Sequence, residues 1–268
     1  MTALRRLIAL STLGVLAASC ASGPAVPATS RTPATATTGI AEPTNRAESL
    51  APTSTPTPAP VPVAPSTPPV AAPLSTLFSE LAVAPEHRTG YDRDLFPLWI
   101  DADHDGCNTR YEVLIADAVT PPTISGTCHL TGGSWFSTYD GKTLDGAAQV
   151  EIDHVVALAE AWYSGAWDWT TARREQYAND LGVPWTLVPS SHSSNQSKGS
   201  NDPAEWIPPR AADVCPYVSS WIEIKVRWGL TIDRAEHDAL QRYLSGCPDE
   251  VVVVPRVPAQ ATIGTKPG

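Results

Sequence analysis

The stretch EIDHVVALAEAW at residues 151–162 is the part of the chain that decides the fold. It begins with the β-forming residues of an apolar strand and continues into good helix formers, which Gly165 stops. The pair Asp153-His154 stands where the strand should end. Neighbouring residues on a strand point to opposite faces, so both side chains can serve one site only where the backbone turns. The pair is a candidate for chemistry, although an isolated Asp-His pair is more often structural.

Two segments further along the chain give this pair a context. PWTLVP at residues 184–189 predicts a short second strand. The serine-rich segment SSHSSNQSKGSNDP at residues 190–203 predicts a capped turn or a short helix, and it holds Asn195 and Lys198. A strand, a second strand and a polar helical turn therefore follow one another with candidate ligands at both ends.

The rest of the core predicts a mixture of helices and strands around this unit. Residues 95–100, LFPLWI, predict a strand because Pro97 blocks a helix, and residues 110–118 predict a helix or a further strand. Further helices are expected at residues 171–179, at residues 214–228 and, with Thr231 as N-cap, at residues 233–244. There is no βαβ repeat and no glycine-rich phosphate loop, so the pattern predicts a single α+β domain.

These segments resemble the HNH nuclease family, and within it the C-terminal domain of GmrSD-type restriction endonucleases and the exported nucleases related to it. The resemblance rests on Asp153-His154 in EIDHVVALAEAW, on Asn195 in NQSKGSNDPAEW and on DADHDGCNTRYEVL at residues 101–114. It covers roughly residues 95–247. It implies an α+β fold with a ββα-metal core surrounded by helices: a strand with the histidine, a second strand, and a helix with the last ligand.

The resemblance also implies a reaction, which is hydrolysis of phosphodiester bonds in DNA, with RNA as a second substrate. Asp153 and Asn195 would bind one divalent cation, for which Mg²⁺ is the first choice and Mn²⁺ the second, because hard oxygen ligands suit both. His154, held neutral, would take a proton from the attacking water. Asn179 is the best candidate for holding His154 in place. We expect the protein to act as a monomer.

Three further residues have two interpretations each. His192 competes with Asn195 for the last ligand position, since residues three apart share a helix face. Lys198 is either a phosphate contact beside the metal or a solvated turn residue. Arg110 is either a second phosphate contact or half of a structural salt bridge.

A rival function comes from the front of the core. Asp101, Asp103, Asp105 and Glu112 match the calcium-loop pattern D-x-D-x-D-G-x5-E position by position. Ca²⁺ at this second site would suit a calcium-binding cell-surface module without catalysis. Against it, Pro97 denies the loop the entering helix of an EF-hand.

The ends of the chain predict an exported protein. Residues 1–20 read as a signal peptide of the lipoprotein type, with Arg5 and Arg6 before an apolar run and Cys20 in the position of a lipidated residue. Residues 21–75, rich in Pro, Thr and Ala, predict a disordered stalk. The folded domain is expected at residues 76–247, and a low-complexity tail with one edge strand at residues 248–268. We expect an extracytoplasmic protein, either secreted or lipid-anchored, with no other membrane contact.

Cysteine usage and charge complete the expectation. In an exported protein Cys107, Cys128, Cys215 and Cys247 predict disulfides, and no C-x-x-C pair suggests zinc. Three pairings are open, and short loops favour Cys107–Cys128 with Cys215–Cys247. Residues 76–247 carry 24 Asp and Glu against 12 Lys and Arg, a formal charge of −12. This balance excludes a protein that holds nucleic acid by bulk electrostatics, but not an enzyme that meets phosphate through a bound cation.

Overall fold

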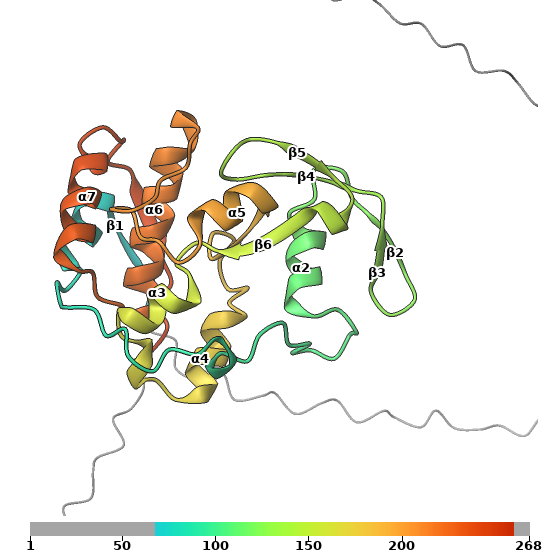
Figure 1. The fold of residues 1–268 in the computed structure, drawn as a ribbon, viewed down its shortest axis with the longest axis horizontal. Helices are drawn as coiled ribbons and strands as arrows, with labels where there is room; N and C mark the ends of the chain where they lie inside the picture. The colour runs from blue at the N-terminus through green and yellow to red at the C-terminus, as the bar shows by residue number, and fades with distance from the viewer. Residues whose placement is uncertain (1–67, 260–268) are drawn as a thin grey trace, which may run out of the picture. The chain divides into compact units, whose positions relative to one another are not determined.

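The computed structural model describes residues 68–259, which form helices and short antiparallel strands joined by two disulfides (Figure 1). The strands pair two by two: β1 (Val70–Pro73) with β8 (Val251–Val254), β2 (Thr123–Ser125) with β3 (His129–Thr131), β4 (Ser134–Phe136) with β5 (Thr143–Asp145), and β6 (Val150–His154) with β7 (Leu187–Ser191). The α-helices are α1 (Leu74–Glu80), α2 (Thr109–Ala116), α3 (Leu158–Tyr163), α4 (Thr171–Ala178), α5 (His192–Lys198), α6 (Ala211–Trp228) and α7 (Arg234–Leu244). Within these residues no helix has both the length and the apolar character needed to cross a membrane.

The pair β6–β7 and the helix α5 lie between two groups of elements (Figure 1). On one side α6 packs against α1, α7 and β8, and on the other lie the β2–β3 and β4–β5 hairpins, beyond α2. Val150 and Ile152 of β6 face a core that also holds Leu114 of α2 and Trp135 of β4. A larger core surrounds α6, whose Trp221 and Ile222 are fully buried. Burial of apolar surface on both sides fixes the position of the central unit.

Most expected elements are found where the sequence places them. β6, α3, α4, β7, α6 and α7 lie within a few residues of the predicted segments, and residues 109–116 adopt the helix of the two alternatives. The predicted N-cap of α7 is wrong: Asp233 caps the helix in a capping box with Glu236, while the Thr231 hydroxyl donates to the Ser164 carbonyl.

The strand predicted at residues 95–100 is absent. The chain forms a short 3-10 helix, η1 (Arg93–Leu95), and then runs without regular structure. The Asn179 side chain supplies the hydrogen bonds that a neighbouring strand would have made, because its amide donates to the Pro97 carbonyl and its oxygen accepts from the Ile100 N–H. The hydrogen bonds of this segment are thus made to one side chain and not to a neighbouring strand.

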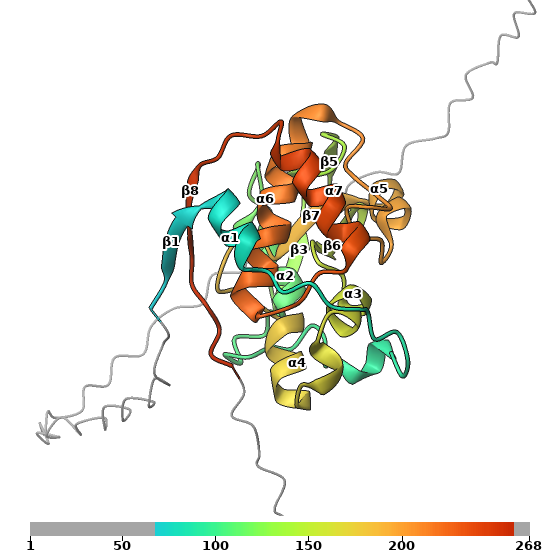
Figure 2. The same ribbon diagram turned by 90° about the vertical axis from the view of Figure 1, so that its left-hand side faces the viewer.

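The folded unit extends beyond both boundaries drawn at residues 76 and 247. β1 begins at Val70, in the segment expected to be stalk, and pairs with β8 in the segment expected to be tail (Figure 2). The edge strand expected in the tail is β8. The signal peptide at residues 1–20, Cys20 and most of the stalk lie outside the described residues.

Both predicted disulfides are confirmed. Cys107 is bonded to Cys128 and Cys215 to Cys247, closing loops of 21 and 32 residues. The first joins the start of α2 to the β2–β3 hairpin, and the second joins α6 to the chain just after α7.

Candidate active site

The strands β6 and β7 and the helix α5 form a strand–strand–helix unit. β6 and β7 run antiparallel with Asp153 opposite Val188 and His154 opposite Leu187. α5 begins directly after β7, where the Ser191 hydroxyl accepts from the Ser194 N–H as N-cap. Gly199, with φ of +54°, ends the helix in a conformation that favours glycine. The unit has the order of strand, strand and helix that the resemblance implied.

Asp153, His154 and Asn195 line one cleft of about 360 Å³. The walls of this cleft come from the end of β6, from α3, from the end of α5 and from the segment around η1. The lining residues are Tyr91, Arg93, Ile152, Asp153, His154, Ala157, Leu158, Ala159, Tyr163, Asn195, Gly199 and Ser200. Residues from three separate stretches of sequence, 91–93, 152–163 and 195–200, thus meet at the position where β6 ends.

The ring of His154 is buried and held in one orientation. Its Nε2 lies 2.9 Å from the Ala178 carbonyl, and the rings of Tyr177 and Trp99 lie near it at centroid distances of 6.3 and 5.8 Å. Burial is the largest influence on this group and lowers the pKa of His154 to about 4. A carbonyl only accepts hydrogen bonds, so the neutral ring carries its proton on Nε2 and leaves the Nδ1 lone pair free.

One oxygen of Asp153 is fully committed inside the protein. Oδ2 accepts from the Tyr139 hydroxyl at 2.6 Å and lies 2.8 Å from the Lys198 ammonium. Lys198 also donates to the His154 carbonyl at 3.0 Å. In the described part of the chain no residue donates to Asp153 Oδ1, so this oxygen is the one available to the cleft.

The expected phosphate contact by Lys198 is corrected by its burial. The side chain is 0% exposed, so neither a phosphate at the surface nor solvent can reach its ammonium group. Lys198 is the internal counter-ion of Asp153. It therefore acts on the cleft only through the carboxylate that it holds.

Asn195 is the second oxygen donor of the cleft. It is half-buried on α5, and within residues 68–259 its side-chain amide has no hydrogen-bond partner. His192, its competitor, is exposed, does not line the cleft, and lies 3.2 Å from Glu151. The geometry favours Asn195 over His192. Two unengaged oxygens, one carboxylate and one amide, fit a hard cation such as Mg²⁺, which keeps several of its waters and uses few protein ligands.

Asn179 and Arg110 make contacts different from those expected. The Asn179 side chain does not touch His154; the carbonyl of the preceding Ala178 holds the ring, while Asn179 fastens residues 97–109. Arg110 does not line the cleft and forms no salt bridge in the described chain. Its guanidinium donates to the Ala147 and Val150 carbonyls, which ties α2 to the start of β6.

Arg93 is a cleft residue that sequence reasoning missed. It stands exposed on η1, forms no ion pair with a carboxylate among the described residues, and its charge contributes to lowering the pKa of His154 after the larger effect of burial. It is the arginine that faces the cleft of Asp153 and His154. No motif marks it, because only the fold brings η1 to β6.

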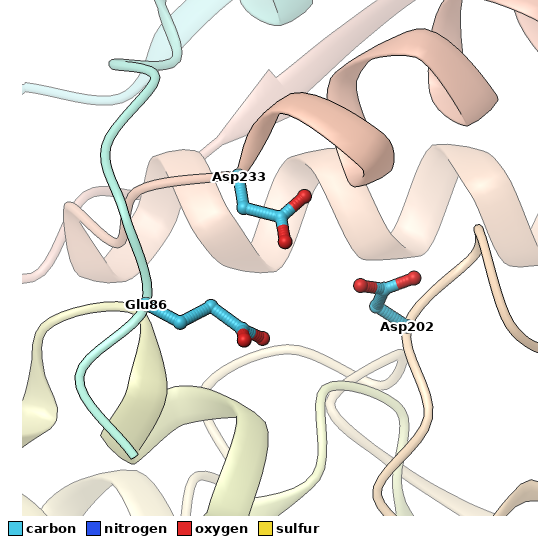
Figure 3. Close-up of side chains that lie close together, drawn as sticks. All are labelled: Glu86, Asp202 and Asp233. Atoms are coloured by element: carbon cyan, nitrogen blue, oxygen red, sulfur yellow. The ribbon is translucent and has the colours of Figure 1, made fainter. Parts of the chain in front are cut away.

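Two groups of carboxylates lie outside the cleft. Asp101, Asp103 and Asp105 form one group, with oxygens within 4.8 Å of one another, and Glu112 of the calcium-loop pattern is not part of it. Glu86, Asp202 and Asp233 form the other group (Figure 3).

Each member of the Figure 3 group already accepts a hydrogen bond. Arg88 donates to Glu86, the Ala204 N–H to Asp202, and the Glu236 N–H to Asp233. These bonds serve a surface ion pair, a turn and a helix cap, so we assign this group no ligand.

Comparisons with known proteins match a domain family to the part of the chain that holds most of the cleft residues, but not Tyr91 and Arg93. Residues 127–243 match the family described as GmrSD restriction endonucleases, C-terminal domain, and this range includes Asp153, His154 and Asn195. The chain is also similar to an uncharacterized secreted protein of Arthroderma benhamiae, with 44% identity over 184 residues that cover 68% of this chain and 89% of the relative. No solved structure matches the chain.

Proposed function

This chain belongs to one family with the secreted protein of Arthroderma benhamiae and carries a domain of the GmrSD C-terminal type, and from this membership we propose that it is an exported, metal-dependent endonuclease of the HNH type. The observation that carries the proposal is the neutral, fixed His154 beside two unengaged oxygen donors in one cleft. The proposed substrate is DNA, with RNA as a second one.

His154 is the general base of the proposed reaction. Because Nε2–H is held by the Ala178 carbonyl, Nδ1 is the atom that takes the proton from the attacking water. The low pKa keeps this nitrogen unprotonated at neutral pH. The rings of Tyr177 and Trp99 lie near the His154 ring, and the hydrogen bond to the Ala178 carbonyl holds it in one orientation, which is what proton transfer over a short distance needs.

Asp153 and Asn195 are the residues that would hold a divalent cation, Mg²⁺ or Mn²⁺. When bound, such a cation stabilises the negative charge that phosphodiester hydrolysis develops. Tyr139 and Lys198 hold Asp153 by Oδ2 and so direct Oδ1 to the cleft. Arg93 supplies the positive charge that an acidic protein needs to receive a phosphate at this cleft.

Export is part of the proposal. The relative is named as a secreted protein, and both cysteine pairs of this chain form disulfides, which persist in oxidising compartments. Attachment of lipid at Cys20 remains a separate proposal. A calcium-binding module without catalysis would need no neutral histidine in a cleft, so we rank that alternative second.

The test is cleavage of plasmid DNA by the purified chain with Mg²⁺, with Mn²⁺ and with chelator. We expect cleavage that requires metal and falls about 10²–10⁴-fold in His154→Ala, the usual contribution of a general base. The matched control is His192→Ala, on the same unit but outside the cleft, which should cleave like the wild type. A folded, metal-supplied protein that leaves plasmid intact contradicts the nuclease proposal, and equal loss in His192→Ala contradicts the ligand assignment.

A further inference from the structure

The cleft continues into a surface on which aromatic rings and cationic side chains lie together. Tyr91, Arg93 and Tyr163 line the cleft itself. The guanidinium carbon of Arg88 lies 4.8 Å from the centroid of the Tyr163 ring, and the Arg88 side chain is 59% exposed. The surface ends in a stacked pair of rings. Its members, which we call the aromatic wall, are His87, Arg88, Tyr91, Arg93, Tyr163 and Trp167.

Trp167 is the member of the wall whose exposure needs an explanation. The chain has nine tryptophans, all in the described residues, and Trp167 is the exposed one, at 45%. Its ring stacks on the exposed His87 at a centroid distance of 4.6 Å. A lone apolar residue at a surface is ordinary, but this one belongs to a group that reaches the cleft. An indole held beside a cleft with much of its surface in water indicates a ligand that covers it.

Hydrogen bonds and ring contacts fix the arrangement of the wall. The His87 N–H donates to the Tyr163 carbonyl at 2.9 Å, and the Trp162 indole donates to the Thr89 carbonyl at 3.1 Å. Tyr91 contacts the Tyr163 ring edge-on, at a centroid distance of 6.1 Å. This segment is therefore fastened along α3, which also lines the cleft. A surface fixed in advance loses little conformational entropy when a ligand binds.

The charges of the wall limit how it can attract a nucleic acid. Arg88 is paired with Glu86 at 2.5 Å, whereas Arg93 forms no ion pair in the described chain. One uncompensated arginine on a protein with a net charge of −10 cannot hold a run of phosphates. Aromatic rings attract nucleic acid differently, because every base has a π-face on which a ring can stack.

We propose that the aromatic wall binds unpaired bases, so that the cleft acts preferentially on single-stranded nucleic acid and on single-stranded stretches of a duplex. This inference rests on the proposed function and names the state of its substrate. The bases of a duplex are paired and stacked on one another, so their faces cannot reach Trp167, whereas those of a single strand can. Residues 87–93 lie outside residues 127–243, so the matched domain family does not account for the wall.

The experiment measures binding of fluorescent DNA to the full purified chain, in chelator so that no metal-dependent cleavage occurs. Three probes of about 12 nucleotides are compared: a single strand, the duplex of the same sequence, and a strand of abasic sites that keeps the phosphates but lacks the bases. We expect the single strand to bind at least about tenfold more tightly than the duplex and the abasic strand, because it alone offers free base faces.

Variants decide whether the wall is responsible. Trp167→Ala should weaken binding of the single strand about 5–150-fold, the usual contribution of one stacked base, and leave binding of the duplex unchanged. Trp167→Tyr keeps a stacking ring and should retain most of the affinity. His87→Ala removes the exposed ring that holds Trp167, so it should weaken single-strand binding too and tests the wall if Trp167→Ala does not fold.

The matched control is Phe136→Ala. Phe136 is also an exposed ring, at 42%, and has the Arg210 guanidinium 5.1 Å from its centroid, but it lies on β4 and does not line the cleft. This variant should bind the single strand like the wild type. Melting curves of each variant establish that it is folded.

Equal affinity for the three probes, or no saturable binding of the single strand, would overturn the proposal. Wild-type affinity in folded Trp167→Ala would also overturn it, as would an equal loss in Phe136→Ala, because the effect would then not belong to the wall. Intact plasmid together with Trp167-dependent binding of the single strand would contradict only the nuclease function. Plasmid cleavage without such binding would contradict only the assignment of the wall.

Discussion

At the scale of single residues, the cleft depends on side chains that do not line it. Tyr139 and Lys198 are buried, and both hold Oδ2 of Asp153. They hold the carboxylate in place inside the protein and leave its other oxygen for the cleft. Lys198 also fixes the backbone of the next residue through the His154 carbonyl. One buried ammonium group therefore contacts both the side chain of the proposed ligand Asp153 and the backbone of the proposed base His154.

Removing that ammonium should destabilise the protein strongly. Lys198→Met keeps the length of the side chain but leaves Asp153 as a buried charge with one hydroxyl partner, which should lower the free energy of unfolding by about 3–5 kcal/mol. Urea unfolding measures this. Lys142→Met is the control, because the Lys142 side chain, paired with Asp140, is 57% exposed and should contribute under about 1 kcal/mol. Equal losses of unfolding free energy in the two variants would contradict the assigned role of Lys198 as the internal counter-ion of Asp153.

The residues of the cleft could be predicted from sequence only in part. Asp153, His154 and Asn195 stand in recognisable strings, and the structure brings them together. The contacts of Lys198 could not be predicted, because its burial depends on Tyr139 and Asp153, which lie 59 and 45 positions earlier in the sequence. Arg93 was missed for the same reason, since only packing brings it to β6.

At the scale of elements, the paired strands β1 and β8 close the folded unit. Val254 of β8 is fully buried against the main core, and the carbonyls just beyond it accept from the guanidinium groups of Arg227 and Arg173. These contacts make the C-terminal segment part of the structure. Its sequence, a four-valine run among turn formers, predicted one edge strand but not the partner that β8 has in the supposed stalk.

Truncation tests this assignment. Deleting residues 248–268 removes β8 and should lower the Tm by roughly 5 °C or more, since a buried valine and several hydrogen bonds are lost. Deleting only residues 260–268 leaves every described contact in place and should leave the Tm unchanged. Thermal melting of the two proteins compares them, and the same Tm in both would show that β8 contributes no stability.

The elements differ in how well sequence predicts them. β6, α3, α6 and α7 have strong local patterns and follow the prediction, because apolar periodicity and stop signals act over short distances. Residues 95–100 do not form the expected strand, because the Asn179 side chain takes over their hydrogen bonds. β1 was not predicted, because its composition resembles that of the Pro- and Ala-rich segment before it.

At the scale of the whole molecule, pH acts through a buried ionic cluster in the main core. Lys225 lies 2.5 Å from Glu160 and 3.2 Å from Glu236, and all three side chains are buried. Burial raises the pKa of Glu236 to about 8 and also raises the pKa of Glu160. Two glutamates share one ammonium group, so one of them keeps a proton at neutral pH.

The proton held by the two glutamates determines whether the stability of the protein rises or falls with pH. In the unfolded chain Glu236 ionises near its ordinary value of 4.5, while in the folded protein it stays protonated up to about pH 8. Between these values the folded state binds more protons, so rising pH lowers stability. The low pKa of His154 has the opposite effect, because it lowers stability as pH falls from 6.5 to about 4. The effect of Glu236 on stability is therefore measured between pH 7 and pH 8, above the range in which His154 acts.

We expect the Tm of the wild type to fall from pH 7 to pH 8 and the fall to be smaller in Glu236→Gln, which cannot ionise. Glu250→Gln is the control, because Glu250 is exposed and should leave the slope unchanged. Melting curves at several pH values measure this. A wild-type Tm that rises over this window, or an unchanged slope in Glu236→Gln, would contradict the assignment.

The pairing of β1 with β8 also determines how the molecule responds to force. Val70 lies opposite Val254 and Pro73 opposite Val251, so β1 begins where β8 ends, and beyond Val254 the chain is held by Arg227 and Arg173 through the Pro255 and Pro258 carbonyls. Tension applied between the two termini would peel the hydrogen bonds apart one after another instead of shearing them all at once. Under such tension the contacts of Pro255 and Pro258 with Arg227 and Arg173 would break first and the β1–β8 pair next, while the Cys215–Cys247 disulfide would limit how far the opening travels into α6 and α7.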